Sequence, residues 1–397
     1  MNRSVYYQHM SLVIFASLVA FISACGISDP YETKKTISVS DKNRRILLKE
    51  MSIWQPVDTA NLDLLKGPVD SYSLGESIDC DFKKPEPDDF GSGLNPKFYC
   101  IDKKTGKELK VKYKLRNSEV YGEVAFSRLM YALGFYHDHY FSVRVTCHDC
   151  PKDPWAYIRS GGRPPNTNNT KTIRDFDFDF GTHVFLPAII EEKMSGDKIE
   201  IFEDQGVSWK EFNDFSDLSL EDKTIRDAFV LLMAFVHHAD SKPDQQRLSC
   251  EKGQSVKIKK GRRECSKAKF LVHDGGWSFG AGVELSTNSM RAKMNREFWL
   301  KYPVFRNKKT CKIGVKKLIN SEFVNKEISE DGRKFLADLL EKLSRKQIKD
   351  IFKASRVDLR DSVIHGITPE ESLNLWADAF ETRRREITET TCPKKLR

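Results

Sequence analysis

The stretch AFVLLMAFVHHADSKPDQ, residues 228–245, joins a strongly apolar segment to a charged one. Residues 224–238 are apolar nearly all round, which predicts a buried helix. Asp240 follows this helix directly, and Asp274 follows a second apolar segment in LVHDGG, residues 271–276. An isolated carboxylate beside an apolar element is costly, so each aspartate needs a partner such as a metal ion or a lysine. These two aspartates therefore mark the centre of a candidate site.

The segment HADSKPDQ resembles the catalytic loop of protein kinases, H-R-D-x-K-x-x-N, with Asp240, Lys242 and Gln245 at its Asp, Lys and Asn positions. The segment HDGG resembles the metal-binding D-F-G element, with Asp274 as its aspartate. The resemblance implies that Asp240 orients and deprotonates an attacking hydroxyl and that Lys242 steadies the transferred group. It also implies that Asp274 and Gln245 hold Mg²⁺, although glutamine is one methylene longer than the expected asparagine.

Several features depart from the ordinary protein-kinase pattern. The aspartate turn continues with Gly275-Gly276 rather than Phe-Gly, no A-P-E segment is visible, and G-x-G-x-x-G is absent. The chain therefore looks closer to atypical kinase-like families, such as the bacterial spore-coat kinases and the secretory-pathway kinases. The resemblance implies an α+β, two-lobed kinase-like fold. Its strand-rich N-terminal lobe would span residues 61–192, and its mostly helical C-terminal lobe, with the catalytic loop, residues 193–397.

The upstream parts of the chain lie in the order that a kinase-like fold requires. The glycine-containing loop, Gly91, Ser92 and Gly93, would lie over the phosphates. Residues 184–192 would form the connector that contacts adenine, with Glu192 as its last residue. Alternation predicts a strand at 109–115, and its lysines are candidates for the phosphate contact: Lys112 first, with Lys110 and Lys114 as alternatives. A helix at 119–133, stopped by Gly134, offers a carboxylate to orient that lysine: Glu123 first, with Glu119 as the alternative.

The cofactors that the resemblance implies are Mg²⁺ and ATP or another nucleotide. The implied reaction is phosphoryl transfer to a hydroxyl of an envelope protein or glycan, and adenylyl transfer stays open as a second reaction. The alternative is a pseudokinase-like binding lipoprotein or a structural envelope lipoprotein without catalysis. The expected compartment favours this alternative, because ATP is scarce outside the cytoplasm.

The N-terminus predicts export and lipid attachment. Residues 11–23, SLVIFASLVAFIS, form the apolar core of a signal peptide and are too short to span a bilayer comfortably. They end in Ile22-Ser23-Ala24-Cys25, which resembles the lipobox of bacterial lipoproteins. We therefore expect a signal peptide at 1–24, lipid on Cys25, and a polar tether at 25–60 that leads away from the membrane. Gly26 in place of an aspartate favours the outer membrane.

The other cysteines form an even set, which favours disulfides in an oxidising compartment. Pairing of chain neighbours is the simplest expectation: Cys80 with Cys100, Cys147 with Cys150, Cys250 with Cys265, and Cys311 with Cys392. The alternative for CHDC at 147–150 is a zinc site, but no second close cysteine pair supplies the remaining ligands. The formal net charge of +9 is spread along the chain, so no nucleic-acid partner is expected.

Beyond residue 285 the chain predicts helices at 329–343, 344–354 and 368–387. Capping boxes are expected to open two of them, Ser344 with Gln347 and Thr368 with Glu371. Two further strands are predicted at 140–145 and 183–190.

Overall fold

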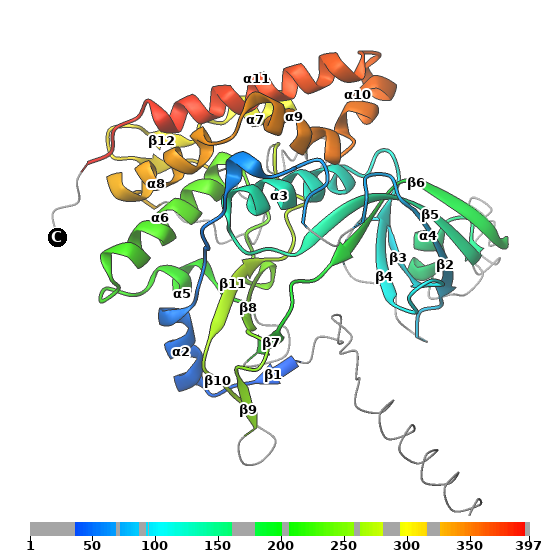
Figure 1. Cartoon of the computed structure of the whole chain (residues 1–397), viewed down its shortest axis with the longest axis horizontal. Helices are drawn as coiled ribbons and strands as arrows, with labels where there is room; N and C mark the ends of the chain where they lie inside the picture. Colours follow the sequence, from blue (N-terminus) through cyan, green and yellow to red (C-terminus); the bar gives the residue numbers. More distant parts are fainter. Residues whose placement is uncertain are drawn as a thin grey trace, which may run out of the picture. The chain divides into compact units, whose positions relative to one another are not determined.

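The structure is a computed structural model. It describes residues 36–68, 72–86, 93, 95–160, 179–200, 206–257, 263–280, 294–315 and 326–393. Residues 36–397 form one compact unit in which helices and strands are mixed (Figure 1). The mixed composition agrees with the predicted α+β class.

Five strands close into a barrel in the order β2-β3-β4-β6-β5. Their bounds are β2 Ser77–Lys83, β3 Lys97–Asp102, β4 Glu108–Tyr113, β5 His139–Pro151 and β6 Phe180–Glu192. Alternate residues of β2 are buried and exposed, as expected for a strand with one face on the core. The barrel interior holds Phe98, Val111, Phe141 and Phe185. The strands predicted at 109–115, 140–145 and 183–190 all lie in this barrel.

The helix α3, Glu119–Leu133, has the bounds predicted from the sequence and stops at Gly134, which adopts the left-handed conformation at φ 81°. Nearly every residue of α3 is buried, including Glu119 and Glu123. It is therefore covered all round, and the carboxylates that it carries lie in the interior rather than in water.

A second sheet has the order β1-β7-β8-β11. Its strands are β1 Thr36–Ser38, β7 Asp197–Glu200, β8 Gln246–Cys250 and β11 Ala268–Val272. The hairpin of β9, Ser255–Lys257, and β10, Arg263–Cys265, lies beyond β8. In the antiparallel pair β8–β11, Gln246 lies opposite Val272. The backbone N–H of His273 donates to the carbonyl of Gln245 (3.1 Å), so the segments after α6 and after β11 are joined.

The helices form the remainder of the fold. Their bounds are α4 Pro154–Arg159, α5 Trp209–Asn213, α6 Leu220–Phe235, α7 Arg296–Lys301, α8 Glu330–Glu341, α9 Arg345–Ala354, α10 Val357–His365 and α11 Pro369–Thr388. Figure 1 shows α11 lying across α7, α8 and α9, and all three contact it. The capping box at Ser344 and Gln347 is formed, while Thr368 accepts from the Glu371 N–H.

A buried arginine closes the C-terminal end of the central helix α6. Arg383 of α11 is fully buried and donates to the carbonyls of Ala234 (2.9 Å) and Phe235 (3.1 Å). Helix-end carbonyls lack partners within their own helix, so these bonds satisfy them in the interior. His237 follows at φ 52°, and the chain turns there into the segment around Asp240.

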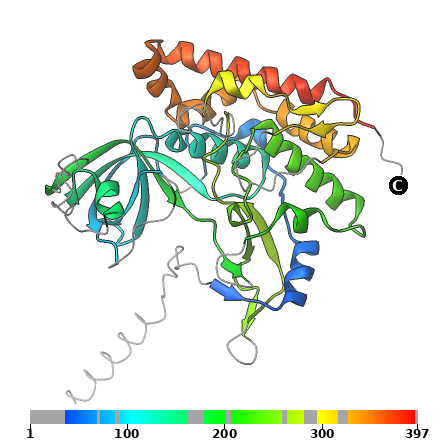
Figure 2. The same cartoon turned by 180° about the vertical axis from the view of Figure 1, so that it is seen from behind.

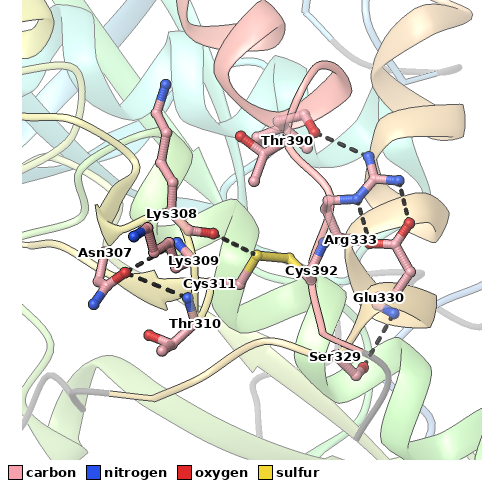
Figure 3. The surroundings of a disulfide bond; sticks show 12 residues. Asn307, Lys308, Lys309, Thr310, Cys311, Ser329, Glu330, Arg333, Thr390 and Cys392 are labelled. Atoms are coloured by element: carbon pink, nitrogen blue, oxygen red, sulfur yellow. Dashed lines mark hydrogen bonds and ion pairs between the residues drawn. A yellow bond between two sulfur atoms is a disulfide. The ribbon is translucent and has the colours of Figure 1, made fainter.

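The four predicted cysteine pairings are all present: Cys80–Cys100, Cys147–Cys150, Cys250–Cys265 and Cys311–Cys392. Because Cys147 and Cys150 bond to each other, the zinc alternative for this segment is excluded. Figure 3 shows the surroundings of Cys311 and Cys392, where the Cys392 N–H donates to Glu330 (2.8 Å). Glu330 also accepts two bonds from Arg333, so the chain after α11 is fastened to the start of α8.

The tether predicted at 25–60 is wrong for the residues from 36 onward. Here the chain forms β1 and the helix α2, Asp41–Glu50, which lies beside the hairpin β9–β10 (Figure 2). Residues 47 and 48 of α2 are buried leucines, and Met51 and Ile53 after it are buried in the same core. A short 3-10 helix, Thr59–Asn61, follows, and the Thr59 hydroxyl donates to the carbonyl of Ala132 at the end of α3 (2.9 Å). This segment therefore belongs to the folded unit.

Some predictions concern residues that the structure does not describe. The signal peptide at 1–24, the lipid-bearing Cys25, and Gly91 and Ser92 of the glycine-containing loop all lie outside the described residues. Within the described part of the chain, no helix is long and apolar enough to cross a membrane.

Candidate functional site

The ammonium group of Lys112 is the centre of a buried charge cluster. Lys112 is 3% exposed, and its Nζ forms an ion pair with Glu123 Oε1. The same Nζ lies 3.5 Å from Glu119 Oε2 and 3.9 Å from Asp274 Oδ2. One lysine thus gathers carboxylates from α3 and from the turn after β11, elements far apart in the chain.

Strand alternation explains why Lys112 and not its neighbours reaches this position. Val111 points into the barrel core, so Lys112 points out of the barrel, toward α3. Lys110 pairs with the Glu191 carboxylate (2.6 Å), and the exposed Lys114 pairs with Asp153 (2.7 Å). Among the three candidate lysines, the structure therefore brings Lys112 to Glu123 and Asp274.

The two predicted carboxylates of α3 act together rather than as alternatives. Glu119 and Glu123 are four residues apart, so they lie on the same face of α3, one turn from each other. The Asn95 amide donates a hydrogen bond to Glu119 Oε1 and holds that carboxylate from the other side.

Burial and charge act in opposite directions on this cluster. Burial would lower the pKa of Lys112, but Asp274, Glu123 and Glu119 together raise it well above its ordinary value. Burial would raise the pKa of Asp274, but Lys112 above all holds it far below the ordinary range. Burial raises the pKa of the fully buried Glu123 well above its ordinary value, although Lys112 opposes the rise. A charged lysine and an ionised Asp274 therefore face each other at neutral pH.

The Asp274 turn is held by its own backbone and packs closely on α3. Asp274 Oδ1 accepts from the Gly276 N–H (3.1 Å). A Cβ on Gly275 would overlap the Phe126 ring, and a Cβ on Gly276 would lie 2.6 Å from Glu119 Cγ. The Gly-Gly pair, which departs from the expected Phe-Gly, thus leaves space for two side chains of α3.

Asp240 lies in the loop after α6, 8% exposed, with Lys242 and Gln245 beside it. Lys242 Nζ is 3.1 Å from Asp240 Oδ1, and the Gln245 amide donates to Asp240 Oδ2 (3.3 Å). Burial raises the pKa of Asp240, and Lys242 opposes the rise. The Ala239 N–H donates to the carbonyl of Trp277 (3.0 Å), which links this loop to the Asp274 turn.

The oxygen atoms present suit a hard divalent cation. Asp274 is ionised, its side chain is 25% exposed, and the Glu119 carboxylate shares its lysine neighbour. Mg²⁺ prefers oxygen ligands of this kind. Gln245, predicted as the second ligand, turns its amide nitrogen toward Asp240 instead. Asp274 is therefore the better placed of the two predicted metal ligands, and the role of Gln245 stays a prediction.

The structure also describes two further predicted residues, Gly93 and Glu192. Gly93 adopts φ +76°, and a Cβ there would lie 3.3 Å from Lys97 Nζ at the start of β3. Glu192 is the last residue of β6 and lies opposite His139 of β5. Its neighbour Glu191 is the residue that contacts a lysine of β4.

Sequence reasoning missed a second group of side chains that could bind a metal ion. Asp138, Glu191 and His273 each offer a ligand atom, and these three atoms lie within 4.8 Å of one another. They come from the segment before β5, the end of β6 and the residue after β11. No spacing motif connects residues so far apart. The one local signal was that His273 stands beside Asp274.

Comparisons with known proteins find remote structural likeness but no sequence relative. No protein-family model matches the chain, and no curated protein sequence matches it. Among solved structures, the chain is similar to the crystal structure of a Helicobacter pylori proinflammatory kinase, CtkA, with a TM-score of 0.37 and 8% sequence identity. The alignment covers 79% of this chain and 95% of that chain.

Proposed function

We propose that this chain is a lipid-anchored protein of the bacterial envelope whose kinase-like domain binds a nucleotide with Mg²⁺ and transfers its phosphoryl group. The acceptor would be a hydroxyl of an envelope protein or glycan. One observation carries the proposal: the buried Lys112 meets both Glu123 of α3 and Asp274 of the turn after β11. Phosphoryl transfer depends on such positioned charges, because its transition state needs electrostatic stabilisation more than covalent chemistry.

Each residue then has a role that its position permits. Lys112, oriented by Glu123, would neutralise charge on the phosphates of the nucleotide. Asp274 would hold the metal ion, which supplies further charge neutralisation when bound. Asp240 would accept the proton of the attacking hydroxyl, and its raised pKa suits a proton acceptor better than that of an ordinary aspartate. Lys242 would steady the transferred group. Transfer of the adenylyl group from the same nucleotide remains part of this proposal as a second reaction.

A specific contact favours a second candidate, a pseudokinase-like protein that binds without catalysis. Asp240 is held by both Lys242 and the amide of Gln245. A proton acceptor must be within reach of the substrate hydroxyl, so these contacts would have to loosen before transfer. In the binding-only form, these contacts would keep the loop ordered beside a bound envelope ligand.

The proposed location rests on the lipobox-like segment that ends at Cys25. The four disulfides support it, because such bonds persist in oxidising compartments such as the periplasm. Labelling of growing cells with a fatty-acid analogue tests the anchor: the native protein should carry the label, and Cys25→Ser should lose it. An unlabelled native protein that is nevertheless exported would contradict lipid attachment.

Titration with nucleotide in the presence of Mg²⁺ tests the site. We expect saturable binding of ATP or another nucleotide, lost in Asp274→Asn and Lys112→Met and retained in the control Lys114→Met. Asp240→Asn then separates the two candidates: it should abolish phosphate transfer and leave nucleotide binding in place if the protein is an enzyme. Absence of binding for every nucleotide at millimolar concentration would overturn the proposal.

A further inference from the structure

We propose that Asp138, Glu191 and His273 form a second divalent-metal site, which takes a transition-metal ion such as Zn²⁺ or Mn²⁺. This inference does not depend on the proposed nucleotide site. It rests on the convergence of three side chains that can each bind a metal ion. It also rests on the hydrogen bonds by which residues outside the cluster orient these side chains.

Strand register brings the three residues together. Tyr140 lies opposite Glu191 in the pair β5–β6, so Asp138, just before β5, lies at the same end of that pair as Glu191. An isolated bridge pairs His137 with Val272, and His273 follows at once. The three ligand atoms lie within 4.8 Å of one another. Ligands about 2.1 Å from a tetrahedral ion are roughly 3.4 Å apart, so side-chain adjustments of about 1 Å would complete the site.

The contacts of His273 fix which ring nitrogen can bind a metal. Its Nε2 lies 2.7 Å from the backbone carbonyl of Asp244. A carbonyl oxygen only accepts, so Nε2 carries the proton and Nδ1 keeps its lone pair. Metal-binding histidines commonly donate their second N–H to such a carbonyl, which sets both tautomer and ring orientation.

The two carboxylates are also held from outside the cluster. Asp138 Oδ1 accepts from the Met194 N–H (2.7 Å), and Glu191 Oε2 accepts from Lys110 Nζ (2.6 Å). The Asp138 side chain is almost completely buried, and the Glu191 side chain is 3% exposed. Each carboxylate has a second oxygen, so anchoring one oxygen orients the group without removing it as a ligand.

The donor set selects the class of metal. One imidazole nitrogen with two carboxylate oxygens suits Zn²⁺ or Mn²⁺ better than Ca²⁺, which takes more oxygen ligands, or Cu⁺, which prefers sulfur. Three protein ligands leave a coordination position for water.

Calorimetric titration of the full chain with ZnCl2, and separately with MnCl2, tests the site. We expect one saturable event, weakened at least about tenfold in Asp138→Asn and in Glu191→Gln. The matched control is Asp217→Asn, which removes an exposed carboxylate that pairs with Lys49 on the surface. Anomalous X-ray scattering at the zinc edge from soaked crystals would place the ion between the three ligands.

Two outcomes would overturn the inference. One is an adventitious ion only: weak uptake that does not saturate in the native protein. The other is native-like binding in both folded variants. If Asp138→Asn fails to fold, Glu191→Gln and the zinc-dependent rise in Tm of the native protein decide the matter. Asp274→Asn separates this site from the proposed function, because it should lose nucleotide binding and keep zinc binding.

Discussion

Gly122 of α3 and Gly276 of the Asp274 turn touch backbone to backbone: a Cβ on Gly122 would lie 2.8 Å from the carbonyl oxygen of Gly276. The helix that carries Glu119 and Glu123 can therefore approach the turn that carries Asp274 only because this helical position has no side chain. Gly122 therefore helps to set the geometry of the Lys112 cluster, although it carries no functional group.

Gly122→Ala should destabilise the protein by about 1–3 kcal/mol, because the new methyl group would push α3 off the turn. At an open helix position the same change would stabilise by about 0.5–1 kcal/mol, so the sign of the effect is informative. Chemical denaturation measures it. Gly181→Ala is the control, since among the described residues a Cβ there meets only His183 Nε2, at 3.7 Å. A stabilised Gly122→Ala protein would contradict the close approach.

Lys112→Met should cost about 3–5 kcal/mol of unfolding free energy, because it removes the cation beside Asp274 and Glu119 and the hydrogen-bond donor of the buried Glu123. The double variant Lys112→Met/Glu123→Gln should lose less than the sum of the two single variants, with a coupling of about 1–3 kcal/mol. Denaturant titration of all four proteins gives this coupling. Additive losses would show that the pair does not interact as described.

Lys114→Met is the matched comparison for that cycle. Lys114 lies on the same strand and pairs with Asp153, but both side chains are more than 40% exposed. Ion pairs in water contribute little, so this variant should change stability by no more than about 1 kcal/mol.

Local sequence patterns were enough to predict the elements that carry the site. Alternation along β4 and the stop at Gly134 gave the strand and the helix that bring Lys112 to Glu123. The even cysteine set, paired by nearest neighbours, predicted all four disulfides, because three of the pairs join cysteines only 3, 15 and 20 residues apart and the fourth joins the two cysteines that remain.

Features that depend on distant parts of the chain could not be predicted in this way. The helix α2 has a polar sequence, and its leucines become core residues only through contacts with distant elements such as β10 and α6. The convergence of Asp138, Glu191 and His273 follows from strand register, which no spacing in the sequence encodes. The joint role of Glu119 and Glu123 likewise required the position of α3.

Stability should fall between pH 7 and pH 5 in a way that depends on His238. Burial lowers the pKa of His238 to about 4, whereas the unfolded chain has the ordinary value of 6.5. The folded state thus keeps this ring neutral, and below pH 6.5 the unfolded state binds a proton that the folded state does not. The contribution is complete above pH 6.5 and is lost as the pH falls toward 4, by roughly 2 kcal/mol between pH 7 and pH 5.

Urea denaturation of the native protein and of His238→Gln at both pH values checks this expectation. Other buried histidines titrate in both proteins, so the quantity of interest is the difference between the two pH dependences. The variant should show the weaker dependence by roughly 2 kcal/mol. Equal pH dependence would mean that the ring is protonated as easily in the folded chain as in the unfolded one.

Removal of the Cys311–Cys392 disulfide should destabilise the chain more than removal of Cys147–Cys150. The first bond closes a separation of 81 residues and the second a separation of only 3. A cross-link restricts the unfolded chain more when it closes a longer loop, which predicts losses of about 4.5 and about 2 kcal/mol respectively. The native contacts point the same way, because Cys392 also donates to Glu330, which is itself held by Arg333 (Figure 3).

Two double-alanine variants, Cys311→Ala/Cys392→Ala and Cys147→Ala/Cys150→Ala, make the comparison under identical denaturing conditions. Each replaces a complete pair, so neither leaves a free thiol that exchanges with the remaining bonds. The difference of about 2.5 kcal/mol should appear in the midpoint of unfolding with an unchanged native circular dichroism spectrum. Equal losses, or a larger loss at Cys147–Cys150, would mean that the chain after α11 is held to the helices by their packing and not by the cross-link.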